Sequence, residues 1–186
     1  MPELFSLLLG VVVTLAMVAT LRRFASFQAQ RPADYATSGP RFDLPQHLSG
    51  PMLCEGVIYG PTGRVTSRFV AEMEGKWDGN RGVLDEVFRY DSGSVQKRAW
   101  HLDVAADGSI KATANDVVGA GSGRAEGSGV LLRYKIRLTR EAGGHVLDVT
   151  DWMYLMENGT IINRSQFFKF GIQVAELVAT LRRRPA

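Results

Sequence analysis

Apolar positions follow two different patterns along the chain. Residues 4–21 form an apolar run that contains no charged residue. After Pro51 the pattern changes to short segments in which apolar and polar residues alternate, separated by turns that contain glycine. A long apolar run predicts a helix, whereas alternation predicts strands with one buried face and one wet face. We therefore expect one N-terminal helix followed by a β domain.

The β region is expected to contain about eight to ten strands. Alternation is clearest in residues 100–104, 110–114 and 132–138, and Asn158-Gly159 predicts a two-residue type I′ hairpin turn, which needs positive φ at both positions. Residues 171–183 fit either a strand or a helix. This many strands with short links favours a closed up-and-down antiparallel β-barrel or a sandwich. We predict the barrel because closure leaves no exposed strand edge.

The same patterns divide the chain into three parts. Residues 1–27 form the apolar anchor, residues 28–50 a linker or strap, and residues 51–186 the barrel domain. The middle part is rich in proline, glycine and serine and has no sustained period, apart from an expected short turn at 43–47. The interior of a barrel of this size is either filled by side chains or admits one small ligand.

The apolar run is long enough to cross a membrane. As a helix it covers roughly 27 Å, against about 30 Å for a hydrocarbon core. Met1 to Glu3 offers no basic side chain and no persuasive cleavage site follows, so a membrane span is favoured over a signal peptide. Arg22 and Arg23 directly after the run predict a single-pass protein with its domain on the cytoplasmic side. An export signal is the alternative.

Net charge and cysteine count exclude several classes. The chain has a net charge of +3, but +2 of it comes from Arg22, Arg23 and Arg31 against Glu3, so the remainder gives no reason to expect a nucleic-acid protein. A single cysteine excludes an intramolecular disulfide framework. The three histidines are isolated, and we expect no metal and no cofactor. The basic residues at the two ends are expected either to meet an anionic membrane surface or to be solvated: Arg22, Arg23, Arg182, Arg183 and Arg184.

Charged residues inside apolar runs indicate a candidate site. By alternation Glu86 shares a face with Leu84, and Asp151 shares one with Met153, while Arg164 is in phase with apolar neighbours. A buried charge is costly unless it is paired, so Glu86 or Asp151 is expected to meet Arg164 inside the barrel, as a head-group site, a structural clamp or the product of a bulge. The candidate ligand-binding residues are Glu86, Tyr90, Trp100, Asp151, Trp152, Tyr154, Asn163 and Arg164. No catalytic set is recognised.

Several motifs, taken in order, resemble a bacterial family. They are Glu74-Gly75-Lys76-Trp77-Asp78-Gly79, residues 84–93 (LDEVFRYDSG), Asp116-Val117-Val118-Gly119, Asp151-Trp152-Met153-Tyr154-Leu155, Asn163-Arg164-Ser165 and Lys169-Phe170-Gly171. From about Asp34 to Arg183 the chain resembles the domain-of-unknown-function family numbered 3833. The resemblance implies a lipocalin-like, membrane-associated barrel without defined catalytic residues, and an association with genes for modifying membrane fatty acids. Relatives are often lipoproteins, whereas this chain has an apolar span followed by Arg22 and Arg23, for which we expect the bacterial inner membrane.

Three functions remain open at this stage. The first is a membrane-tethered, non-catalytic barrel that binds a membrane lipid or fatty-acyl group, or presents it to a fatty-acid-modifying enzyme. The second is a scaffold subunit with a filled barrel that docks a membrane enzyme. The third is an enzyme that uses Glu86 or Asp151 as acid or base. An apolar, open interior distinguishes the carrier from the scaffold.

Overall fold

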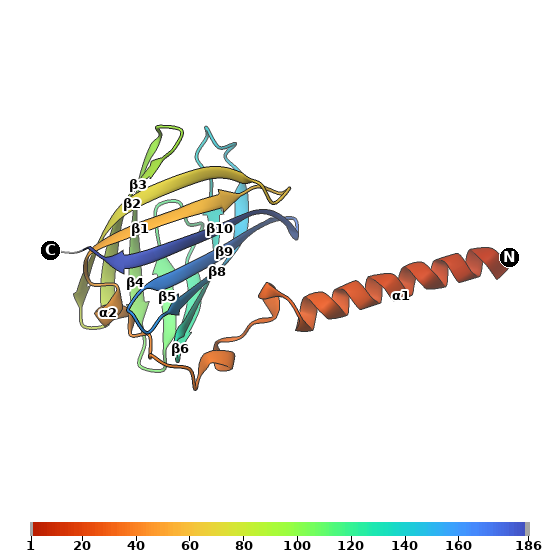
Figure 1. Cartoon of the computed structure of the whole chain (residues 1–186), viewed down its shortest axis with the longest axis horizontal. Helices are drawn as coiled ribbons and strands as arrows, with labels where there is room; N and C mark the ends of the chain where they lie inside the picture. The colour runs from red at the N-terminus through yellow and green to blue at the C-terminus, as the bar shows by residue number, and fades with distance from the viewer. Residues whose placement is uncertain (1, 185–186) are drawn as a thin grey trace.

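A computed structural model describes residues 2–184, which form a long N-terminal helix, a connecting segment and a β-barrel (Figure 1). The helices are α1 (Pro2–Phe24) and α2 (Leu44–His47), with the 3-10 turns η1 (Phe27–Ala29) and η2 (Pro32–Tyr35) between them. The strands are β1 (Gly50–Tyr59), β2 (Val65–Asp78), β3 (Arg81–Tyr90), β4 (Val95–Val104), β5 (Ser109–Thr113), β6 (Gly121–Glu126), β7 (Gly129–Arg137), β8 (Val146–Leu155), β9 (Ile161–Lys169) and β10 (Ile172–Arg183).

The strands close into an antiparallel up-and-down barrel. Each strand pairs with its neighbours in sequence, and β1 pairs with β10 from Met52 opposite Arg183 to Tyr59 opposite Glu176. The predicted barrel is therefore confirmed, and the ambiguous segment 171–183 is the strand β10. Closure satisfies the backbone groups that an open sheet would leave at its edges.

The expected turn at Asn158-Gly159 lies in the right place but has a different geometry. Gly159 has φ of 80°, whereas Asn158 is not among the residues with positive φ. Met156 and Thr160 are joined by a backbone hydrogen bond, so the loop has three residues and glycine takes the left-handed position. A turn with two adjacent positive φ values occurs instead at Phe170 (53°) and Gly171 (76°), between β9 and β10.

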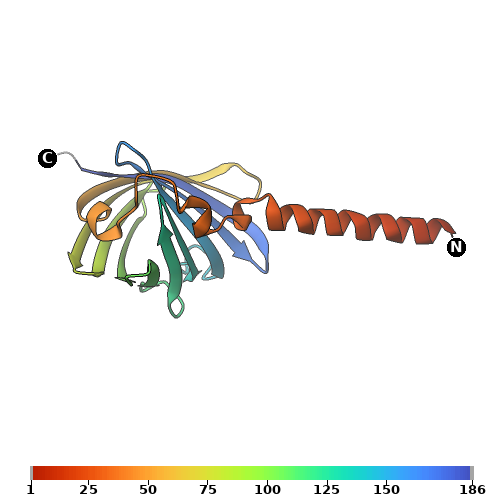
Figure 2. The same ribbon diagram turned by 90° about the horizontal axis from the view of Figure 1, so that it is seen from below.

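The two ends of the barrel differ. We call the end that carries α2 and the C-terminus the closed end, and the end formed by the loops 60–64, 91–94, 114–120, 138–145 and 170–171 the open end. In Figure 1 the β1–β2 and β9–β10 hairpins lie on the side from which α1 extends, while the C-terminus lies on the other side. The connecting segment runs along the barrel from α1 to α2 (Figure 2).

Helix α2 seals the closed end. Asp43 caps it by accepting a hydrogen bond from the backbone amide of Gln46 at 3.0 Å, and its Leu44, together with the following Leu48, points into the barrel. Trp77 donates its indole N–H to the carbonyl of Leu48 at 3.0 Å. A Cβ atom on Gly75 would lie 1.7 Å from that carbonyl oxygen, so only glycine lets the cap approach β2 this closely.

Helix α1 does not pack against the barrel. Its segment Glu3–Leu21 has no buried residue and is long and apolar enough to cross a membrane, although a signal sequence meets the same criteria. Such a surface is stable in lipid or in detergent but not in water.

We expect Leu48→Ala to lower the free energy of unfolding by about 2–5 kcal/mol, because Leu48 is only 1% exposed and its loss leaves a void under the cap. Val70→Thr on the exposed wall of β2 is the control and should change stability by less than about 0.5 kcal/mol. Urea unfolding of the detergent-solubilised chain measures both, and equal effects would contradict the role of the cap.

Candidate functional site

The barrel encloses a cavity of about 760 Å³. It begins beneath Leu44 and Leu48 at the closed end and reaches the exposed residues Ser92 and Glu141 in loops of the open end. Its volume is within the range of small-molecule pockets, about 300–1,000 Å³. The interior is therefore hollow and accessible from one end.

One side of the cavity is apolar. It is formed by inward-facing side chains of β1, β2, β3 and β10, with Phe69 and Phe88 in edge contact at a centroid distance of 5.2 Å. Other apolar lining residues on this side are Ile58, Met73, Leu84, Leu177, Ala179 and Leu181. This surface suits a hydrocarbon chain because most of its side chains are apolar; its hydrogen-bonding side chains are Ser67, Glu86 and Tyr90.

The opposite side is polar and is centred on Arg98 of β4. The Arg98 guanidinium lies 4.1 Å from the ring centroid of Trp100, and its Nε lies 3.1 Å from Oδ1 of Asp116. Asp116 comes from the loop between β5 and β6. Within the described chain Nε and Nη2 of Arg98 and both Asp116 carboxylate oxygens lack a hydrogen bond of good geometry. The pair thus keeps unused donors and acceptors inside the barrel.

Glu86 lies opposite Arg98 in the β3–β4 pair and faces the cavity. Burial raises the pKa of Glu86 to about 7, an effect that Arg98 opposes and that Asp151 and Asp116 strengthen. Its Oε2 atom has no hydrogen-bond partner in the described part of the protein. This carboxyl group therefore changes protonation state near neutral pH.

Asp151 of β8 is the best-satisfied acid in the cavity. It accepts hydrogen bonds from the Asn163 amide, from Ser165 Oγ at 2.9 Å and from the Tyr134 hydroxyl at 3.3 Å. Burial raises the pKa of Asp151, although the bonds from Asn163 and Ser165 act in the opposite direction. Burial, followed by the nearby Asp151 charge, also raises the pKa of Tyr134. These groups form a hydrogen-bonded patch beside Arg98.

The structure brings five of the candidate residues together in the cavity wall: Glu86, Tyr90, Trp100, Asp151 and Asn163. Two central residues, Arg98 and Asp116, were missed. Arg98 alternates in phase with Trp100 and Leu102. The same pattern identified Glu86, so the sequence alone could have indicated Arg98. Asp116 lies in a loop where no alternation exists, so only the tertiary structure reveals it.

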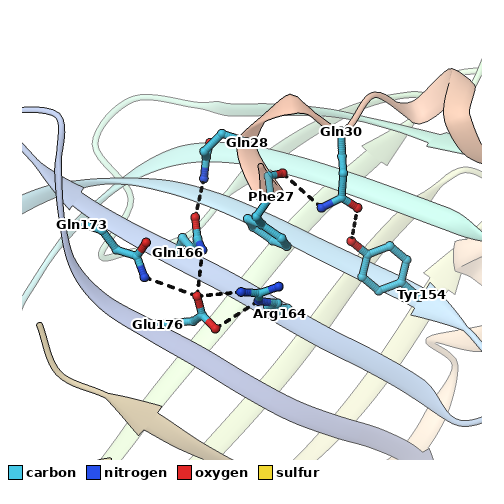
Figure 3. A network of polar contacts seen from close by, with 8 residues as sticks. All are labelled: Phe27, Gln28, Gln30, Tyr154, Arg164, Gln166, Gln173 and Glu176. Carbon is cyan, nitrogen blue, oxygen red and sulfur yellow. Dashed lines mark hydrogen bonds and ion pairs between the residues drawn. The ribbon is translucent and has the colours of Figure 1, made fainter. Parts of the chain in front are cut away.

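The expected pairing of Arg164 with Glu86 or Asp151 is wrong, because Arg164 lies on the outside of the barrel (Figure 3). Its Nε and Nη2 atoms donate to the Glu176 carboxylate at 3.0 and 3.1 Å, and its guanidinium stacks 4.5 Å from the Phe27 ring centroid. Gln28 donates to Gln166, which donates to Glu176 at 2.7 Å. This network binds the connecting segment to β9 and β10.

Partial burial would raise the pKa of Glu176, but the hydrogen bonds from Arg164 and Gln166 lower it below its ordinary value. The stabilisation from this network is therefore present above the ordinary carboxyl pKa. It is lost as the pH falls through the lowered value.

Trp152 and Tyr154 also lie on the outer face, beneath the connecting segment. Tyr35 packs against Trp152 at a centroid distance of 5.3 Å, and the Tyr154 hydroxyl donates to Gln30 Oε1 at 2.7 Å. Trp152 is fully buried although it faces away from the cavity. Because the segment 27–42 covers this wall, β8 and β9 are buried on both faces, and apolar neighbours no longer identify the inward phase.

The basic residues of the two ends do not form one surface. Arg182 pairs with Glu55, and Arg183 donates to the carbonyl of Gln46 at 2.6 Å, both at the closed end. Arg23 belongs to the last turn of α1, and Figure 1 shows α1 on the side of the barrel opposite the C-terminus. The structure therefore separates the two groups along the length of the barrel.

Cys54 lines the cavity, but its thiol is unreactive. Cys54 is buried, and burial followed by the Glu86 charge raises the pKa of its thiol to about 12, so the thiolate is not populated at neutral pH. Among the described residues no group of His, Cys, Asp and Glu is arranged to hold a metal ion.

We expect Glu86→Gln to stabilise the protein at pH 8 by about 2 kcal/mol, and by much less at pH 5. The folded-state pKa of Glu86 exceeds its unfolded value, so the folded chain binds more protons between the two, and stability falls as the pH rises toward 7. Urea unfolding at both pH values measures the difference. A pH-independent effect of the substitution would contradict the buried titration.

We expect Arg164→Met to loosen the connecting segment without changing the cavity. The Arg164–Glu176 pair is partly exposed, so its removal lowers the free energy that holds the segment by about 1 kcal/mol or less. This corresponds to at most about five-fold faster proteolysis within residues 28–41. Arg68→Met, which removes the exposed pair with Asp91, is the control. Unchanged cleavage in Arg164→Met would contradict the anchoring role.

Two solved structures share the barrel fold. The crystal structure of Rv2717c from M. tuberculosis has a TM-score of 0.55 and 15% sequence identity, covering 78% of this chain and all of that one. The S-type phycobiliprotein lyase CPES from Guillardia theta also has a TM-score of 0.55, with 8% identity, covering 76% of this chain and 90% of that one. At these identities the similarity establishes the fold only. No curated protein sequence matches the chain.

The resemblance to family 3833 is confirmed over most of the chain. The match covers residues 21–183, including the connecting segment, all strands and the residues of both cavity walls. The chain belongs to the family described as "Protein of unknown function (DUF3833)".

Proposed function

We propose that this protein is a membrane-tethered carrier whose barrel binds a lipid or fatty-acyl group. The observation that carries the proposal is the cavity of about 760 Å³, which opens at one end and has one apolar and one polar wall. A scaffold with a filled barrel would have no such interior. The division into two walls matches an amphiphile, with its chain against Phe69 and Phe88 and its polar group near Arg98.

The charges in the cavity narrow the class of ligand. The cavity is lined by four acids and two cations. Of the cations, Arg98 is already paired with Asp116, and Arg137 is exposed at the open end; the acids are Glu86, Asp116, Glu141 and Asp151. A free carboxylate or phosphate would meet an excess of negative charge and lose its hydration. The site therefore favours an acyl chain attached to an uncharged or amine-bearing polar group that donates hydrogen bonds to the acidic side chains.

The tether is supported by α1, whose exposed apolar surface is long enough to cross a bilayer. Arg22 and Arg23 at its C-terminal end favour a cytoplasmic position for the barrel by the positive-inside rule. With the barrel held at the membrane, a bound acyl group would be available to an enzyme that modifies membrane fatty acids. We propose such an enzyme as the partner.

We expect the full-length protein, extracted in mild detergent, to retain acyl lipids in native mass spectrometry. Ala179→Phe adds a ring to the cavity wall and should reduce retention at least ten-fold, whereas Val70→Phe adds the same ring to the exposed wall and should have no effect. Equal retention by both variants would mean that lipid binds elsewhere, and no retention by the unmodified chain would overturn the carrier.

A second candidate is an enzyme that uses Glu86 as acid or base. The observation that favours it is a buried carboxyl group in an accessible cavity with a pKa of about 7, close to the value that general acid–base catalysis requires. The masses of the recovered lipids distinguish the two functions. Lipid that is altered by the unmodified chain but not by Glu86→Gln would favour the enzyme, and unaltered lipid in both favours the carrier.

A further inference from the structure

The connection between α1 and the barrel is very short. Only Ala25 and Ser26 separate α1 from η1, and Phe27 of η1 is already fixed against Arg164 on the barrel wall. Two intervening residues span at most roughly 10 Å. If α1 crosses a bilayer, as proposed above, the barrel cannot stand away from the membrane but must lie against its surface.

The wall that carries Arg164 determines which part of the barrel faces the membrane. Arg164 belongs to β9, which continues toward the β9–β10 hairpin at the open end. Figures 1 and 2 show this hairpin on the side from which α1 extends, with the C-terminus on the opposite side. The closed end is therefore directed away from α1.

The open end carries most of the exposed large apolar side chains of the barrel. Phe170 at the tip of the β9–β10 hairpin is 90% exposed, and Ile172 beside it is 69% exposed. The others at this end are Val65, Val95, Val118 and Val146, whereas the closed end has Met156. A phenylalanine with positive φ is unfavourable on its own, and here the strained position holds an aromatic ring in solvent.

From these observations we propose that the β9–β10 hairpin inserts into the interface of the bilayer that α1 spans, so that the open end of the barrel faces the lipid. The partner is a lipid surface rather than a protein, because the tether brings this rim to the membrane and leaves no space for an intervening domain. A membrane lipid then reaches the cavity without crossing water.

Apolar contact rather than charge drives this docking. The open-end loops together with Lys169 contain three basic residues, Arg64, Arg140 and Lys169, and three acidic ones, Asp91, Asp116 and Glu141, so their charges cancel. Screening by salt weakens exposed charge interactions but not the burial of Phe170 and Ile172. The docking should therefore persist at 0.5 M salt.

The experiment measures the depth of each end of the full-length chain in phosphatidylcholine vesicles that contain nitroxide lipids. A fluorophore is attached to Thr62→Cys at the open end or to Glu157→Cys at the closed end. Cys54 is buried and stays unlabelled. We expect at least three-fold stronger quenching at residue 62 than at residue 157. Equal quenching, or stronger quenching at residue 157, would overturn the docking.

Substitutions at the hairpin tip test the contact itself. Phe170→Asn suits positive φ and Ile172→Thr keeps a β-branched residue, so both preserve the hairpin while removing its apolar surface. Together they should at least halve the quenching at residue 62, whereas Met156→Gln at the closed end should leave it unchanged. Unchanged quenching in the double variant would contradict insertion of the hairpin.

Alkaline extraction of the vesicles separates this proposal from the proposed tether. A chain that resists extraction but shows equal quenching at both ends refutes the docking alone. A chain that is released by alkali refutes the tether, and the quenching ratio of the same chain before extraction still decides whether the open end contacts lipid. Lipid retention in native mass spectrometry reports on the cavity independently of both.

Discussion

Pairing of the first strand with the last is the constraint on which the rest of the structure depends. Once β1 and β10 pair over Met52–Tyr59, every strand has two neighbours and each side chain points either into the barrel or out of it. An open sheet of the same strands would place Glu86 and Arg98 on a solvated face. There burial would not shift the pKa of either side chain. Closure thus creates both the cavity and its electrostatics.

The connecting segment adds a second layer on one side of this barrel. Tyr35 covers Trp152, and its carbonyl would lie 1.6 Å from a Cβ atom on Gly127, a position that also has positive φ. The segment continues through Phe42, whose amide donates to the Gly127 carbonyl at 2.7 Å, to the α2 cap. One stretch of chain therefore covers the β8–β9 wall, seals the closed end and fixes the point at which α1 leaves the barrel.

The polar wall of the cavity lowers the stability that a purely apolar interior would provide. Arg98 and Asp116 pair with each other, but several of their nitrogen and oxygen atoms are buried without a hydrogen bond of good geometry in the described chain, and burial raises the pKa of Glu86 above its ordinary value. Such groups cost free energy unless they are compensated. A fold that needed only a filled core would be more stable with apolar residues at these positions, so their cost is best explained by ligand binding.

The local pattern of the sequence determined the N-terminal helix, the alternating strands and the inward phase of Glu86, Asp151 and Trp100, because these depend on periodicity and burial on one face. It did not determine the position of Arg164 or Trp152. Their wall is buried on both sides by a segment distant in sequence, so apolar neighbours do not distinguish inside from outside. The pairing of Arg98 with Asp116, the closed end and the side on which α1 leaves likewise depend on contacts between distant segments, which only the tertiary structure decides.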